Sequence, residues 1–320
     1  MTHHNIGVGH LEPIDELLLD DQAIAEQVLK VKQERNAVIL VHNYQRPEVQ
    51  DIADFTGDSL GLSREAARTE ADVIVFCGVH FMAETAYILS PDKVVLLPEI
   101  RAGCPMADMA DAADVVKARE EHPGAMVVSY VNTTAAVKAV SDYCCTSANA
   151  VKVVEAVEAD EILFVPDRNL AAYVASMVDK KIIPWDGFCP THDEMTAEQV
   201  MRALAEHPNA EVIAHPECRQ EVLAIANHVR STSGMLNTAA TSDAEEFIIA
   251  TESYMLYPLG KAAPDKRFYA LPGNPICPNM KLTTLSKVLW ALQTLEPRVT
   301  VPEDIRMLAL QAVERMLALG

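Results

Sequence analysis

Three cysteines share a pattern that could build a metal centre. Cys104, Cys189 and Cys277 are each followed directly by proline, and they stand 85 and 88 residues apart. Such even spacing predicts three similar units that each supply one thiolate to a shared metal or cluster. Structural zinc usually takes four protein ligands, so three cysteines leave an open position. On an iron–sulfur cluster an open position is a Lewis-acid site for substrate, which favours catalysis over electron transfer.

The sequence between the cysteines repeats as well. Apolar, β-branched runs predict buried strands at 38–41, 73–76, 94–97, 126–129, 162–165, 181–184, 212–214, 247–250 and 267–270. First strands matched at Val38, Val127 and Val212 are 89 and 85 residues apart. The stretches 121–127 and 206–212 also share five of seven residues. The chain therefore contains a repeated unit of about 85 residues.

Helical patterns lie between and after these strands. We predict helices at 23–32, 63–68, 112–119, 148–157, 197–204, 282–293 and 302–319. Alternation of strands and helices is typical of parallel sheets covered on both faces. The expected fold is three similar small three-layer α/β units with parallel sheets, arranged with pseudo-threefold symmetry around a central cavity.

The expected boundaries follow the repeat and the cysteines. The first unit, with an N-terminal helix, spans 1–110, the second 111–194 and the third 195–285. The remaining segment, 286–320, holds C-terminal helices that we expect to pack on the first unit. Each unit is small for an independent domain, so mutual packing is expected.

Composition narrows the class of protein. With 320 residues and 50% hydrophobic residues the chain can bury a sizeable core, and it has no apolar run long enough to predict a membrane span. Residues 1–10 lack the basic and apolar segments of a signal peptide, which predicts a cytoplasmic protein whose seven cysteines are thiols or metal ligands. The formal net charge of −20 argues against nucleic-acid binding.

Polar residues follow the first strand of each unit, at 42–44, 130–132 and 215–217. Ligands of parallel sheets bind beyond the carboxyl ends of the strands, so these side chains should share one site. One such cluster alone could be an ordinary polar strand end, but three in register favour a site for proton transfer. The side chains concerned are His42, Tyr44, Tyr130, Asn132, His215 and Glu217.

Hydroxyl residues recur at the predicted helix starts that follow. Ser59 and Ser147 are 88 residues apart, and Thr232, beside Ser231, lies 85 further on. A hydroxyl at a helix start is ordinarily an N-cap. The same place is also an anion site that needs no lysine or arginine, because backbone N–H groups and the helix dipole favour negative charge. Three such sites would suit a substrate with carboxylates and a phosphate. The chain has no nucleotide-binding glycine motif.

Several stretches together resemble the quinolinate synthase family. They are 41–45, 51–59, 104–107, 130–132, 145–150, 166–170, 215–218 and 279–280. The resemblance runs in a single register from about Ala23 to the C-terminus, and only about the first twenty residues lie outside it.

The resemblance implies an activity and a cofactor. Members of this family condense iminoaspartate with dihydroxyacetone phosphate to give quinolinate, phosphate and water, in the de novo route to NAD. They carry an oxygen-sensitive 4Fe-4S cluster on three cysteines between three similar α/β domains, with the fourth iron open. By motif, the ligands fall on Cys104, Cys189 and Cys277. A transient contact with an iminoaspartate-producing enzyme is a further expectation.

Roles for the other residues follow from chemistry. Glu217 is the expected base, because the reaction requires proton abstraction next to a carbonyl or imine. Tyr44 and Tyr130 can donate protons to leaving hydroxyls, and Asn132 can orient the triose. We expect the remaining side chains to contact substrate carboxylate or phosphate oxygens: His42, His192, His215, Ser59, Ser147, Ser231 and Thr232.

Alternatives remain open at this point. His192, three residues after Cys189, could complete a zinc site with the three cysteines, giving a zinc-dependent hydrolase or a non-catalytic zinc scaffold. His42 and His215 could be satisfied histidines at unit junctions. The cysteines outside the repeat are expected to be buried free thiols, namely Cys77, Cys144, Cys145 and Cys218.

Overall fold

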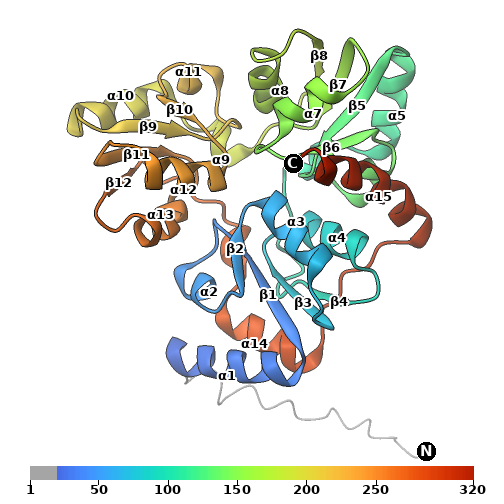
Figure 1. The fold of residues 1–320 in the computed structure, drawn as a ribbon, viewed down its shortest axis with the longest axis vertical. Coiled ribbons are helices and arrows are strands. Elements are labelled where there is room, and N and C mark those ends of the chain that lie inside the picture. Colours follow the sequence, from blue (N-terminus) through green and yellow to red (C-terminus); the bar gives the residue numbers. More distant parts are fainter. Residues whose placement is uncertain (1–19) are drawn as a thin grey trace, which may run out of the picture.

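The computed structural model describes residues 20–320, and these contain three four-stranded parallel sheets (Figure 1). The first is formed by β1 (Ala37–His42), β2 (Phe55–Gly57), β3 (Val73–Cys77) and β4 (Val94–Leu96). The second holds β5 (Ala125–Tyr130), β6 (Tyr143–Cys145), β7 (Glu161–Val165) and β8 (Lys181–Pro184). The third holds β9 (Glu211–Ala214), β10 (His228–Val229), β11 (Glu246–Ala250) and β12 (Arg267–Ala270).

All three sheets have the same topology. Their strand orders are β2-β1-β3-β4, β6-β5-β7-β8 and β10-β9-β11-β12, so the first strand of each unit is internal. The predicted α/β fold with three similar units is therefore confirmed. The predictions missed β2, β6 and β10, which are edge strands of only two or three residues. The equally short β4 was predicted because it lies in the apolar run 94–97, whereas β2, β6 and β10 contain no apolar run of that length.

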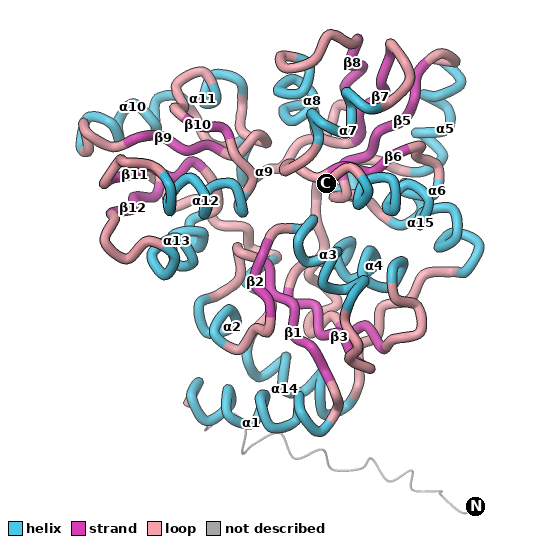
Figure 2. Tube along the Cα trace, viewed as in Figure 1, coloured by secondary structure: helices cyan, strands magenta, loops and turns pink. Residues whose placement is uncertain are grey.

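Helices flank each group of strands (Figure 2). Those near a predicted helix are α1 (Asp21–Glu34), α3 (Ser59–Arg68), α5 (Ala112–Glu121), α7 (Ala150–Ala156), α10 (Ala197–Glu206), α14 (Leu285–Thr294) and α15 (Glu303–Ala318). Helix α12 (Thr232–Thr241) begins at the helix start predicted at Thr232. Those not predicted are α2 (Pro47–Asp51), α4 (His80–Leu89), α6 (Ala135–Ala139), α8 (Arg168–Ala175), α9 (Pro190–Asp193), α11 (Gln220–Leu223) and α13 (Leu256–Ala262). Helix α4 buries six of its ten residues, so it lacks a polar face that would mark it as helical.

One polar contact recurs in all three units and explains part of the repeat. A side chain just before the edge strand accepts a hydrogen bond from a backbone N–H of the first strand. The pairs are Ile39 to Asp54 at 2.8 Å, Val127 to Asp142 at 2.8 Å and Val212 to Asn227 at 2.7 Å. These side chains fix the segment that leads into each short edge strand.

The two C-terminal helices pack in different places. Helix α14 lies against α1 of the first unit, as expected. Helix α15 differs from the expectation, because it packs mainly on α6 and β6 of the second unit and touches the first unit through α4. Its end is held by second-unit contacts: Asn149 donates to Met316 O at 3.2 Å, and Arg315 donates to Asp142 O at 2.6 Å. The boundaries expected at 110, 194 and 285 stay predictions.

The buried core is shared between units. One cluster of buried apolar side chains includes Leu40 of the first unit, Val128 of the second and Ile249 of the third. The units therefore pack against one another, as their small size requires. None of the helices described in 20–320 is both long enough and apolar enough to span a membrane.

Candidate functional site

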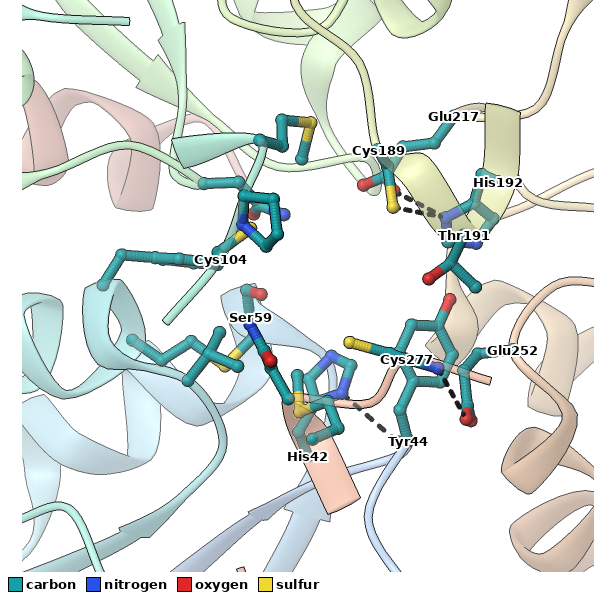
Figure 3. A pocket seen from close by; sticks show the side chains of 18 of the residues that line it. His42, Tyr44, Ser59, Cys104, Cys189, Thr191, His192, Glu217, Glu252 and Cys277 are labelled. Carbon is teal, nitrogen blue, oxygen red and sulfur yellow. Dashed lines mark hydrogen bonds and ion pairs between the residues drawn. The ribbon is translucent and has the colours of Figure 1, made fainter. Parts of the chain in front are cut away.

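A pocket lies where the three units meet, with a cavity volume of about 150 Å³ (Figure 3). It brings together nearly all the side chains expected to form a site. Its lining includes Cys104, Cys189, Cys277, His42, Tyr44, Ser59, Tyr130, Asn132, Ser147, His192, His215, Glu217 and Thr232. The cysteines come from three different units and stand on separate sides of the opening.

Ser231 is the expected site residue that does not line this pocket. It is the N-cap of α12, and its hydroxyl accepts the Gly234 N–H at 3.3 Å. The next residue, Thr232, lines the pocket and accepts a 2.8 Å hydrogen bond from the Asn43 amide of the first unit. The ordinary capping role is therefore the one that the structure supports for Ser231.

Each Cys-Pro pair opens a short helical turn. The Cys104 carbonyl accepts from Asp108 N at 3.2 Å, and the Cys189 carbonyl accepts from Asp193 N at 2.8 Å. After Cys277, the Pro278 carbonyl accepts from Lys281 N at 3.1 Å. Proline suits the first position of such a turn, because its φ is already helical and no N–H is left unpaired there. The repeated proline thus places each cysteine at the beginning of a turn that faces the pocket.

Burial keeps the pocket thiols protonated when no metal is bound. It raises the pKa of Cys104 to about 12, and it also raises the pKa values of Cys189 and Cys277. A metal would therefore have to displace the thiol protons as it binds. The other four cysteines (Cys77, Cys144, Cys145 and Cys218) are fully buried outside the pocket lining, as expected for free thiols.

Glu217 stands at the centre of a polar cluster beside Cys189, with ligand atoms of the two residues within 4.8 Å of each other. The Tyr130 hydroxyl donates to Glu217 Oε1 at 2.5 Å, and His192 Nδ1 lies 2.8 Å from Glu217 Oε2. Burial opposes ionisation of this carboxyl group, but the contacts from His192 and the Tyr130 hydroxyl outweigh it and hold the pKa of Glu217 below its usual range. The side chain is thus an ionised carboxylate at neutral pH.

A hydrogen-bonded chain extends from Glu217 to Tyr44. His192 Nε2 lies 2.8 Å from Thr251 Oγ1, which lies 2.6 Å from the Tyr44 hydroxyl. One direction satisfies every group: Tyr44 donates to Thr251, Thr251 donates to His192, and His192 donates to Glu217. The chain crosses from the first unit to the third, so it forms only when the units are packed together.

Sequence reasoning missed Thr251 and Glu252, which follow β11 directly. Glu252 lines the pocket and is fully buried. The rule that ligands bind beyond strand ends was applied to the first strand of each unit. Applied also to the third strand, it would have found both residues.

The burial of His42 and His215 predicts how the stability of the protein depends on pH. Burial lowers the pKa of each to about 3, from an ordinary value of 6.5, so both are neutral in the folded protein. Below about pH 6.5 the unfolded chain takes up protons that the folded chain does not, so stability should fall as pH decreases toward 3. Each histidine can change the free energy of unfolding by up to about 1.4 kcal/mol per pH unit.

Urea unfolding of the metal-free chain between about pH 5.5 and 7.5 measures this slope. We expect His42→Gln and His215→Gln each to reduce it. A slope unchanged from wild type would contradict the neutral state of that histidine.

Fold and site together define a three-unit α/β protein with a cysteine-lined candidate metal centre between its units. The family model described as Quinolinate synthetase A protein matches residues 26–318. The quinolinate synthase of Methanosarcina barkeri is 58% identical over 295 residues, which cover 92% of this chain and 97% of the relative. Quinolinate synthase 1 of Methanosarcina acetivorans is 59% identical over 292 residues, 91% of this chain and 95% of that protein.

The quinolinate synthase of Thermodesulfovibrio yellowstonii is similar to a comparable degree, at 57% identity over 295 residues that cover 92% of this chain and 97% of the relative. The residues matched by the family model, 26–318, include all three sheets and every residue that lines the pocket. The chain belongs to the quinolinate synthase family and is an enzyme of NAD biosynthesis.

Proposed function

We propose that this enzyme condenses iminoaspartate with dihydroxyacetone phosphate to give quinolinate, phosphate and water. The observation that carries the proposal is one pocket in which three cysteines, one from each unit, face an ionised Glu217 bonded to Tyr130 and His192. Family membership supports the same reaction. Delivery of iminoaspartate by transient contact with the enzyme that makes it is part of the proposal.

The cofactor proposed is a 4Fe-4S cluster on Cys104, Cys189 and Cys277. Within 20–320, these three sulfurs do not all lie within 4.8 Å of one another. Three thiolates on one zinc, at about 2.3 Å each, would bring their sulfurs to within about 4 Å. A cluster spreads its ligands, because each cysteine binds a different iron. The donor set therefore fits a cluster, which when bound would supply an open iron as a Lewis acid for the substrate.

Zinc-dependent hydrolysis, or a non-catalytic zinc scaffold, is the rival hypothesis. One observation favours it: ligand atoms of Cys189, His192 and Glu217 lie within 4.8 Å of one another. Against it, Glu217 and Thr251 already engage both ring nitrogens of His192 without a metal. The two hypotheses require different metals.

Metal analysis after anaerobic purification decides between them. We expect about four irons and four sulfides per chain. Stoichiometric zinc without sulfide would contradict the synthase proposal and favour the rival.

Anion binding is assigned to the hydroxyl residues of the pocket. Ser59 and Thr232 are the first residues of α3 and α12, two ten-residue helices whose N-termini carry partial positive charge. Ser147 lies 3.2 Å from His215 Nε2, across the boundary between the second and third units. We assign substrate carboxylate and phosphate oxygens to these groups and to the neutral His42 and His215.

Asn132 is assigned to binding and orienting the triose substrate. Its Oδ1 is buried and has no hydrogen-bond partner among the described residues, and its side chain lines the pocket. A buried acceptor without a partner is costly, so a substrate hydroxyl that donates to it would be held in a defined place. This supports the orienting role expected for Asn132.

Proton transfer is assigned to the cluster around Glu217. The Glu217 carboxylate accepts the substrate proton, and Tyr130, 2.5 Å away, donates toward a leaving hydroxyl. Tyr44 is the second donor, and the Thr251–His192 chain connects its hydroxyl to Glu217. Burial raises the pKa values of both tyrosines well above 10, so both retain their protons until the substrate requires them.

A further inference from the structure

Glu252 is a buried pocket carboxylate to which the proposed reaction gives no task. It lies two residues beyond β11, just before a 3₁₀ turn at Ser253–Met255. Its Oε1 accepts the backbone N–H of Cys277 at 3.3 Å, and its Oε2 accepts that of Tyr254 at 2.9 Å. Figure 3 shows the bond between Glu252 and Cys277 at the edge of the opening. One carboxylate thus ties the end of β11 to the loop that carries Cys277.

Lys281 extends this contact to the first unit. Its Nζ lies 3.0 Å from Glu252 Oε1 and donates a hydrogen bond to the backbone carbonyl of Tyr44. The ammonium also stands 3.6 Å from the centre of the Tyr254 ring. The Glu252–Lys281 pair therefore connects Cys277 with Tyr44, which lies on the other side of a unit boundary.

The second unit has a similar carboxylate. Asp167 lies two residues beyond β7 and 85 residues before Glu252, and it is also fully buried. Its Oδ1 accepts the backbone N–H groups of Asn169 at 2.8 Å and Leu170 at 2.9 Å as the N-cap of α8, and its Oδ2 has no hydrogen-bond partner among the described residues. In the first unit the matching residue, two beyond β3, is the buried Val79.

The difference between Val79 and Glu252 shows whether folding requires a carboxylate at this position. The first unit forms the same sheet with valine at this place, so the fold does not require a carboxylate there. Buried ion pairs can often be replaced by apolar side chains without loss of stability. A carboxylate that accepts the backbone N–H of a ligand cysteine must therefore have a role other than folding. Groups around a metal site commonly orient the residues that bind the metal, and this is such a role.

We propose that Glu252 is a positioning residue for Cys277, and that its pair with Lys281 fixes Cys277 relative to Tyr44. The proposal rests on the proposed function, in which Cys277 is a cluster ligand. It assigns Glu252 no contact with the reacting atoms.

The first test uses the metal-free chain under anaerobic conditions. Each cysteine is alkylated with iodoacetamide, and mass spectrometry follows the rate at Cys277, Cys104 and Cys189. In Glu252→Leu we expect alkylation of Cys277 to be roughly tenfold faster, with the other two rates unchanged. Glu252→Gln keeps an acceptor for the Cys277 N–H, so it should restore most of the protection.

A control lies at the other end of the strand that precedes Glu252. Glu246 pairs with Arg267 at the opposite end of β11 and touches no ligand cysteine. Glu246→Gln removes a more exposed ion pair at that end of the strand, so all three alkylation rates should match wild type. Lys281→Met should accelerate Cys277 less than Glu252→Leu does, because the carboxylate still accepts the backbone N–H.

The second test uses the chain after cluster reconstitution. We expect Glu252→Leu to release iron to a chelator roughly tenfold faster than wild type and to alter the electron paramagnetic resonance spectrum of the reduced cluster. Glu252→Gln should recover toward wild type in both measurements, and Glu246→Gln should change neither.

Three results would overturn the proposal: no acceleration at Cys277 in Glu252→Leu, equal acceleration at all three cysteines, or no effect of Lys281→Met. Equal acceleration would show general loosening rather than positioning. If wild type holds no iron and sulfide after reconstitution, the proposed function fails instead. The alkylation rates of the metal-free chain still decide the role of Glu252 in that case.

Discussion

Single replacement of Cys104, Cys189 or Cys277 by serine should remove the cluster and reduce turnover to background. Only these cysteines share the repeat spacing and the following proline, and only these line the pocket. A serine hydroxyl is a poor substitute, because iron–sulfur clusters are held by thiolates. Iron and sulfide content, the visible absorption of the cluster and quinolinate formation measure the result.

Cys144→Ser is the matched control. Cys144 is fully buried, and its sulfur lies 3.5 Å from the Ser129 hydroxyl, away from the pocket lining. Serine is smaller and can keep a polar contact there, so we expect cluster content and turnover close to wild type. Equal cluster loss in Cys144→Ser would show that the ligand set has been chosen wrongly.

Much of this fold was predictable, because the repeat reinforces each local signal. Nine strands were predicted from short apolar runs, and each has a counterpart in the other units. Edge strands such as β10, with two residues, carry no comparable signal. The position of α15 was not predictable either, because it depends on contacts such as Asn149 to Met316 O between residues far apart in the sequence.

The site, like the fold, was predictable only in part. The repeat spacing identified the cysteines and the polar ends of the first strands, and the structure places all of these in one pocket. The 85-residue step from Ser147 falls on Thr232, but the spacing alone could not show that the neighbouring Ser231 does not line the pocket. Nor could it find Thr251, which is connected to Tyr44, 207 residues away, only once the units are packed.

The contacts of Glu217 explain how one buried carboxylate can act as a base. Tyr130 and His192 occupy its two oxygens, and its side chain is almost completely buried. Two donors favour the ionised form, which is the form that accepts a proton. Once protonated, Glu217 can give that proton back at a later step, so the same carboxyl group can act as base and then as acid.

Glu217→Gln should therefore remove most of the turnover while leaving the cluster in place. The amide keeps the length of the side chain and one oxygen acceptor, but it cannot accept a proton at neutral pH. A general base typically contributes about 10²- to 10⁴-fold, so we expect a fall of that size in kcat with little change in apparent substrate affinity. Steady-state kinetics of quinolinate formation, with iron and sulfide content measured on the same preparation, tests this.

Two other outcomes would reassign Glu217. Near-normal turnover in Glu217→Gln would move the role of base to another group, with Tyr44 and Tyr130 the nearest candidates within the hydrogen-bonded chain. Loss of iron and sulfide would instead make Glu217 a support of the metal site, since His192 contacts both Glu217 and the sulfur of Cys189, the latter at 3.1 Å. Tyr130→Phe separates these cases, because it removes a donor to Glu217 Oε1 without touching His192. A catalytic Glu217 predicts a lower kcat with full cluster content in that variant, whereas a Glu217 that only supports the metal site through His192 predicts kcat and cluster content both close to wild type.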